Sequence, residues 1–150
     1  MIRKWFISLW VFPVWILGIA LALVILFLGH ELAMVFAART LQADQYGLPL
    51  VHIAYYMMAG VLLLVFIFIS LEHLKRSAQK TRLLAGSLTL TGGLLLAIAL
   101  VQAGLTAYGY FPADLVGILL MAVEGLAGIC MLLAARLRAG ASAGLSAAAK

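Results

Sequence analysis

One carboxylate in this sequence lies where an ionised group is unusual. Glu124 is in the middle of the apolar segment 114–137, and a charge at the centre of such a segment costs at least about 2.5 kcal/mol in a membrane unless it is neutralised, paired or hydrated. Three interpretations remain open: a proton or cation site, an anchor to a partner subunit, or a neutral acid that hydrogen-bonds to a neighbouring helix. No Lys or Arg lies in the interior of an apolar segment, where it could pair with Glu124, so Gln102 is a candidate partner within the chain.

Three histidines raise the question of a haem or a metal. His30 and His52 each fall at an end of an apolar segment and are expected at a matched depth, whereas His73 lies at the opposite boundary. Neither of the first two has a CxxCH motif or a second ligand four residues away, which haem attachment or a metal site on one helix would favour. We therefore expect interfacial histidines bonded to water, and no metal or cofactor.

The sequence offers no catalytic constellation. No nucleophile, general base and orienting third group are spaced to act together. Gly92-Gly93 lies within an apolar segment without a lysine or a preceding strand, so it is not a phosphate-binding loop. Thr89, Gly93 and Ala97 recur every four residues and predict a surface for close helix packing. On the last apolar segment, glycines are expected to serve similarly: Gly117, Gly125 and Gly128. We expect a protein that is not an enzyme.

Composition identifies the solvent in which these residues must act. Of the 150 residues, 67% are apolar and only 10% are charged, and the mean hydropathy is +1.20. A soluble domain is typically about half apolar and a quarter charged. The sequence predicts an all-α integral membrane protein, because about 20 apolar residues in a helix cross the hydrocarbon core. Four transmembrane helices are expected, at about 5–28, 50–71, 83–108 and 114–137.

The basic residues predict the orientation. Nine of the ten Lys and Arg residues fall near the N-terminus, between the second and third spans, or at and beyond the end of the fourth, and Arg39 alone falls on the other side. Positive residues remain cytoplasmic, so both termini are expected inside the cell. Because these residues flank the spans rather than form one face, we expect them to lie beside the lipid bilayer and not to bind nucleic acid.

Two segments lie outside the four spans. Apolar residues in 30–41 recur at helical spacing, so this segment is expected either to extend the first span or to lie along the membrane surface. Residues 139–150 are rich in Ala, Gly and Ser without apolar periodicity, and we expect a mobile tail. The four-helix transmembrane domain is therefore expected to cover residues 1–138.

The region from about residue 20 to residue 76 carries a pattern that is found in a known family. It comprises Gly29-His30-Glu31-Leu32-Ala33, Ala37-Ala38-Arg39, Gln42, Gly47-Leu48-Pro49-Leu50, Tyr55 and Gly60. This pattern resembles the hairpin formed by the last two helices of the small, Q-type membrane subunit of TRAP (tripartite ATP-independent periplasmic) transporters.

The resemblance implies a non-catalytic accessory subunit in a bacterial inner membrane. Such a subunit packs against a larger multi-span membrane subunit that holds the substrate sites, and it helps to dock a periplasmic solute-binding protein. By position, the candidate partner contacts are Glu31, Arg39, Asp44 and Gln45. Two alternatives remain: a small structural subunit of a respiratory or photosynthetic complex, and a small oligomeric ion-coupled transporter that uses Glu124.

Overall fold

The computed structural model describes the backbone of residues 2–40, 47–79, 83–110 and 114–148. Four helices make up this part of the chain: α1 (Ile2–Arg39), α2 (Gly47–Gln79), α3 (Leu83–Ala107) and α4 (Leu115–Ala148). The side chains described are those of residues 10–40, 47–78, 83–110, 114–138 and 140. No strand occurs in these ranges, which confirms the predicted all-α class.

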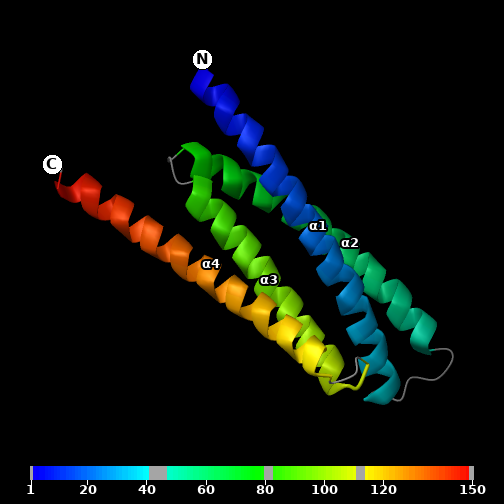
Figure 1. Ribbon diagram of the computed structural model, residues 1–150. Coiled ribbons are helices and arrows are strands. Elements are labelled where there is room, and N and C mark those ends of the chain that lie inside the picture. Colours follow the sequence, from blue (N-terminus) through cyan, green and yellow to red (C-terminus); the bar gives the residue numbers. More distant parts are fainter. Residues whose placement is uncertain (1, 41–46, 80–82, 111–113, 149–150) are drawn as a thin grey trace.

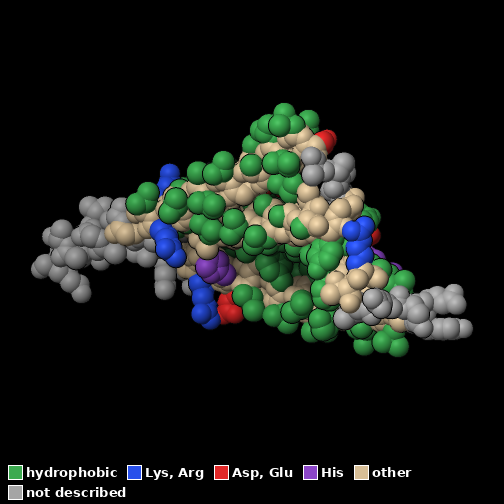
Figure 2. Space-filling view, turned by 90° about the horizontal axis from the view of Figure 1, so that it is seen from below, with side chains coloured by type: hydrophobic (Ala, Val, Ile, Leu, Met, Phe, Trp, Pro, Cys, Tyr) green, Lys and Arg blue, Asp and Glu red, His purple; other side chains and the backbone are tan. Residues whose placement is uncertain are grey.

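All four helices are long and apolar enough to cross a membrane, as the sequence predicts. Between 6 and 22% of the residues in their most apolar stretches are buried inside the molecule, so most apolar side chains are at least partly exposed. Figure 2 shows hydrophobic side chains along the length of one face, with Lys and Arg toward the ends. An outward apolar surface of this extent fits a multi-pass membrane protein.

The helices form a group of three with a fourth attached at one side. Helices α1 and α2 pack on each other, and α3 packs on both of them (Figure 1). Helix α4 packs on α3 and makes no contact with α1 or α2 within the described residues. The ends of α1 and α4 that lead to the two termini lie at the same end of the molecule, where these helices diverge. The cytoplasmic location of that end remains a prediction.

The helices extend beyond the predicted spans. Helix α1 continues without interruption to Arg39, so 30–39 extends the first span and does not form a separate surface helix. It also passes through Pro13, whereas Pro49 lies in the first turn of α2, where its missing donor costs nothing. Helix α4 continues to Ala148, because alanine has the highest helix propensity even without an apolar pattern. The mobility of this Ala-rich segment remains a prediction.

A small core ties three helices together at the end near the termini. Val11, Leu74 and Ala78 are buried there, with Leu83 and Leu90 of α3 packed against them. One polar bond supports this core, since the Trp15 indole N–H donates to the backbone carbonyl of Ile67 at 3.2 Å. Inside a bilayer, where apolar burial alone does not draw helices together, such contacts hold α1, α2 and α3 in register.

Helices α3 and α4 meet through glycine. A Cβ atom on Gly92 would lie 2.9 Å from the carbonyl oxygen of Gly128, and a Cβ on Gly128 would lie 2.8 Å from the carbonyl oxygen of Gly92. The two backbones therefore touch, which is the close approach that small residues permit. Gly128 was predicted to pack in this way. For Gly93 the prediction was wrong, because a Cβ there would meet nothing within 4 Å.

The neighbouring glycines Gly92 and Gly93 provide a matched test of this interface. We expect Gly92→Ala to destabilise the α3–α4 contact by about 1–3 kcal/mol, because the added methyl group collides with backbone, whereas Gly93→Ala adds its methyl group to open space. Thermal unfolding of the two variants in detergent measures the difference. A lower midpoint for Gly93→Ala, or equal midpoints for both, would contradict the described packing.

Candidate functional site

A pair of histidines joins α1 to α2 at the end of the molecule away from the termini. His30 Nε2 lies 2.9 Å from His52 Nδ1, a hydrogen-bond distance in which one ring donates and the other accepts. The His30 side chain is mostly buried, with 12% of its surface exposed, whereas His52 is exposed. The expected matched depth of these two residues is therefore present, but their rings bond to each other.

The direct bond between the two rings bears on the haem and metal question. Two histidines on opposite sides of a metal ion need about 4 Å between their nitrogen atoms, since each metal–nitrogen bond is about 2 Å. The observed 2.9 Å leaves no room for an ion between them. Within the described residues, no group of three or more His, Cys, Asp or Glu side chains could hold a metal ion.

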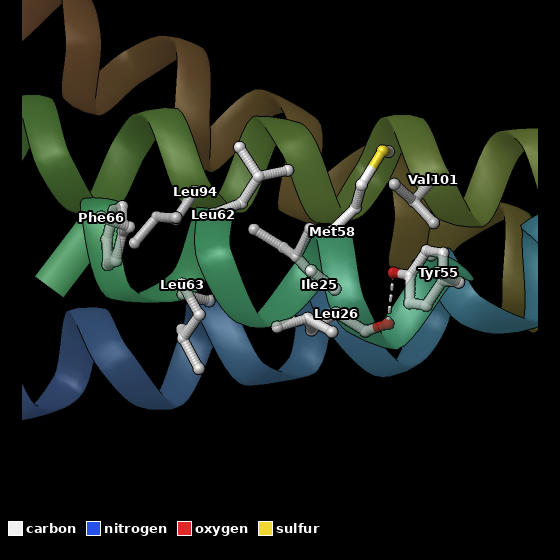
Figure 3. Close-up of a pocket in the computed structure, with 12 residues that line it drawn as sticks. Ile25, Leu26, Tyr55, Met58, Leu62, Leu63, Phe66, Leu94 and Val101 are labelled. Carbon is white, nitrogen blue, oxygen red and sulfur yellow. Dashed lines mark hydrogen bonds between the residues drawn. The ribbon is translucent and has the colours of Figure 1, made fainter. Parts of the chain in front are cut away.

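Two tyrosines of α2 enclose the histidine pair. We call these four residues the outer His–Tyr cluster (His30, His52, Tyr55 and Tyr56), where outer means the end of the molecule away from the termini. The Tyr56 ring stacks on His30, with centroids 5.0 Å apart, and the Tyr55 ring meets His30 edge-on at 5.4 Å. The Tyr55 hydroxyl donates to the backbone carbonyl of Leu26 at 2.7 Å (Figure 3). The cluster is thus a set of aromatic rings with both apolar faces and hydrogen-bonding edges, which suits a membrane boundary.

A second contact links α1 to the connection between α3 and α4. The Tyr110 hydroxyl donates to Glu31 Oε2 at 2.8 Å, and Glu31 Oε1 lies 3.5 Å from His30 Nδ1. The hydrogen bond to Glu31 raises the pKa of Tyr110, because ionisation of the phenol would lose this bond and place two negative charges together. Glu31 therefore connects the outer His–Tyr cluster to a residue far away in the sequence.

The local sequence explains how Tyr110 reaches Glu31. The N–H of Gly109 donates to the carbonyl of Thr106, and the N–H of Tyr110 donates to that of Leu105, the two bonds of a Schellman helix end. This motif needs a left-handed residue, and Gly109 has φ = +70°. Asp114 then caps α4 by accepting the N–H of Gly117 at 2.9 Å.

The four predicted partner contacts are only partly described. Glu31 is engaged with Tyr110, as stated above, and its side chain is 43% exposed. Arg39 is exposed at the end of α1, where a Cβ on Gly109 would lie 3.6 Å from its guanidinium. Both residues therefore lie against the segment that joins α3 to α4. Asp44 and Gln45 lie outside the described residues.

Glu124 lies on the face of α4 that meets α3. Met121 and Gly128, three and four residues away on the same face, contact Thr106 and Gly92. The Oε2 atom of Glu124 is buried and has no hydrogen-bond partner within the described part of the chain. The pairing with Gln102 suggested by the sequence is therefore not made through this oxygen. Gln102 is half-buried on α3, and its backbone carbonyl accepts the Thr106 hydroxyl.

An apolar cavity of about 340 Å³ lies between α1, α2 and α3 and is open to the surface of the molecule, because its lining residues Met58 and Leu62 are exposed (Figure 3). Tyr55 and Val101 are at one end of it, and Phe66 and Leu94 are at the other. Tyr55 is the only lining residue with a hydroxyl group, and that hydroxyl is bonded to Leu26. No pattern in the sequence predicts this cavity. The contact between His30 and His52 beside the cavity had one indication in the sequence, because both residues were expected at the same depth in the membrane.

Comparison with known proteins gives no relative: no family model, no curated protein and no solved structure matches this chain.

The bond between Tyr110 and Glu31 predicts a pH dependence. Because the Tyr110 pKa is raised above the ordinary tyrosine value of about 10, the contact is present at neutral pH and is lost as the pH rises through that pKa. We expect Glu31→Gln to return the Tyr110 pKa toward its ordinary value, as measured by ultraviolet absorbance of the phenolate, with Tyr110→Phe identifying the signal.

Glu72 offers the matched control for that titration. It lies at the other end of the molecule, where it pairs with Arg76 on α2. Glu72→Gln should therefore leave the Tyr110 titration unchanged. A Tyr110 pKa that is the same with and without the Glu31 carboxylate would show that the bond is not formed in solution.

Proposed function

We propose that this chain is a non-catalytic accessory subunit that packs in the membrane against a larger, multi-span transport subunit of a solute uptake system. The single observation that carries the proposal is the position of α4, which contacts α3 and neither α1 nor α2 within the described residues. A helix attached along one side has most of its surface available to another protein in the bilayer. The family resemblance of residues 20–76 supplies the class of partner.

The outward surface of α4 supports this role. Large apolar side chains cover it along the helix from Leu115 to Leu137. Among them, Leu115 is 78%, Leu126 is 62% and Leu137 is 75% exposed. Exposed apolar side chains are tolerated in lipid, so their presence does not by itself require a partner. Because α4 packs on one helix within the described residues and its most apolar stretch is the least buried of the four, it is the surface on which a partner would add the most packing.

The outer end supplies a second kind of contact. Glu31, Tyr110 and Arg39 lie together around the segment that joins α3 to α4. Polar groups at the end of a membrane protein are accessible from outside the bilayer, so they suit a solute-binding protein that arrives from the periplasm. The bacterial inner membrane is part of this proposal, because the resemblance implies a periplasmic partner.

Site-specific crosslinking in native membranes tests the proposal. We expect a small photoreactive side chain at Leu126 to form an adduct with a large multi-span membrane protein, because this position faces away from α3. The same group at Leu132, which lies 3.3 Å from the Cβ position of Gly92, should crosslink within the chain. Mass spectrometry after purification in mild detergent identifies the adducts.

The identity of the captured protein separates the alternatives. Co-purification of a large transport subunit and a periplasmic binding protein would support the accessory role. A partner that carries haem or pigment would instead favour a structural subunit of a respiratory or photosynthetic complex. Adducts with lipid alone at Leu126, together with no larger co-purifying protein, would contradict both.

The buried oxygen of Glu124 favours a second candidate function, an ion-coupled transporter formed by several copies of this chain. A carboxyl oxygen that is buried without a partner is costly, and such groups within membranes are often proton or cation sites. Helices α2 and α4 both have long exposed apolar faces through which copies could associate. This candidate differs from the first in needing a titrating group at Glu124.

Glu124→Gln separates the two functions, because glutamine keeps the shape of a protonated glutamate and cannot ionise. If the accessory role is correct, we expect assembly and solute uptake to persist, because the buried oxygen of Glu124 makes no hydrogen bond within the described residues that the substitution would remove. Loss of proton or cation flux in vesicles, with assembly intact, would favour the transporter. Glu72→Gln, which removes an exposed carboxylate at the membrane boundary, is the control for a general effect of charge.

A further inference from the structure

The hydrogen bond between His30 and His52 has a direction that Glu31 sets. His30 Nδ1 faces the Glu31 carboxylate at 3.5 Å, so a neutral His30 carries its proton on this nitrogen, where it points at the negative charge. Its Nε2 is then an acceptor, and the 2.9 Å contact between the rings requires His52 Nδ1 to donate. The remaining nitrogen of the pair, His52 Nε2, is therefore an acceptor.

This fourth nitrogen lies on the accessible side of the pair. His52 is exposed, and its only hydrogen bond within the described residues is the one with His30. The His30 side chain is mostly buried, and both of its nitrogens face a partner. A proton from water can therefore add to His52 Nε2 without displacing an existing contact.

Addition of one proton leaves the bond between the rings in place. His52 then carries two N–H groups and one positive charge, and its Nδ1–H still donates to His30 Nε2. If the proton in this bond moves to His30 Nε2, His52 Nδ1 becomes the acceptor, so the two rings share the charge. A hydrogen bond with an ionised donor is roughly twice as strong as one between neutral groups. A second added proton would make donors of both facing nitrogens and break the bond.

The charges around the pair favour the first proton and oppose the second. On α1, the Glu31 carboxylate faces His30, and Arg39 lies about 13 Å beyond His30 at 1.5 Å per residue. Helix α3, which packs on α1, has no ionisable side chain. From the connection between α3 and α4, the Tyr110 hydroxyl donates to Glu31. One proton therefore takes Glu31 and the pair from one negative charge to zero, whereas a second leaves one positive charge.

The tyrosine rings of α2 favour the same charge. Tyr56 stacks on His30, with centroids 5.0 Å apart, and meets His52 edge-on at 4.8 Å. The face of an aromatic ring attracts a cation within about 6 Å of its centroid. Tyr55 meets His30 edge-on, and its hydroxyl donates to the carbonyl of Leu26, so it does not compete for the nitrogens of the pair.

We propose that the His30–His52 pair is a proton-binding site that takes up one proton between about pH 8 and pH 5.5, the interval in which histidines titrate, and that the added proton fastens α1 to α2 more strongly. A proton that binds the folded pair more tightly than the unfolded chain stabilises the folded state as the pH falls. A mostly buried histidine that ionises without a partner has the opposite effect, because acid then destabilises the fold.

Nuclear magnetic resonance of the full chain in detergent, with a nitrogen isotope in its three histidines, observes the site directly. A coupling between His30 Nε2 and His52 Nδ1 reports the bond, and the nitrogen shifts report which atoms carry protons. We expect the coupling at about pH 8 and also at about pH 5.5, with one added proton on the pair at the lower pH. Loss of the coupling in acid, or a pair that takes up no proton, would overturn the proposal.

Thermal unfolding in the same detergent measures the effect on stability. We expect the midpoint to rise by about 2–4 °C from about pH 8 to pH 5.5, the shift that corresponds to one bond doubling in strength. His52→Asn is the matched variant, because its amide N–H can still donate to His30 but the side chain cannot take up a proton. It should remain folded at the higher pH and show no rise.

The third histidine and the carboxylate complete the comparison. His73 is exposed at the opposite end of α2, so His73→Asn should keep the full rise, whereas Glu31→Gln, which removes the charge beside His30, should reduce it. A midpoint that is constant or falls in acid for the unaltered chain, a full rise in His52→Asn, or its loss in His73→Asn would each overturn the proposal. If His52→Asn does not give a monodisperse helical protein, the magnetic resonance of the unaltered chain carries the test. These measurements use the chain alone, so they do not depend on the accessory role.

Discussion

The contact between the backbones of Gly92 and Gly128 attaches α4 to the rest of the molecule. Lipid tails are as apolar as leucine, so the large side chains on α3 and α4 gain little by leaving lipid for each other. What they gain instead is close packing, and the two glycines allow it by bringing one backbone against the other. Because α4 contacts α3 alone in the part of the chain that the structure describes, this interface also determines where Glu124 lies and which face of α4 remains outward.

The same argument explains why the sequence predicts the helices better than their packing. Apolar length reveals a spanning helix, because the bilayer requires every backbone group to be bonded within the segment. The face that meets a neighbour leaves a weaker signal, since inward and outward residues are both apolar. The Thr89, Gly93 and Ala97 repeat had the expected spacing, yet Gly92, one residue away, makes the contact. Gly128 was predicted correctly, because the last segment has fewer small residues in competition.

In the candidate site too, the sequence predicts the depth of the residues in the membrane but not their contacts with distant segments. Depth could be predicted, so His30 and His52 were expected at the same level of the membrane, and their 2.9 Å contact agrees with that. Partners from distant segments could not be predicted, because no periodicity connects Glu31 to Tyr110. That contact depends on the left-handed Gly109, which turns the chain at the end of α3 and brings Tyr110 back over α1. The cavity escapes prediction for a similar reason, since its walls come from three helices.

The charge asymmetry that predicts the orientation also shapes the chemistry of the outer end. In the sequence, nine of the ten basic residues fall in the segments that are predicted to be cytoplasmic, which would hold those segments inside the cell. The opposite end has few cations with which its polar side chains could pair. Imidazole, phenol and carboxylate groups therefore form hydrogen bonds with one another there. Such an end is poor at attracting phosphate head groups and well supplied with neutral donors and acceptors. Under the proposed function, a partner at this end would therefore meet the exposed Glu31 and Arg39 side chains beside a set of neutral hydrogen-bonding groups.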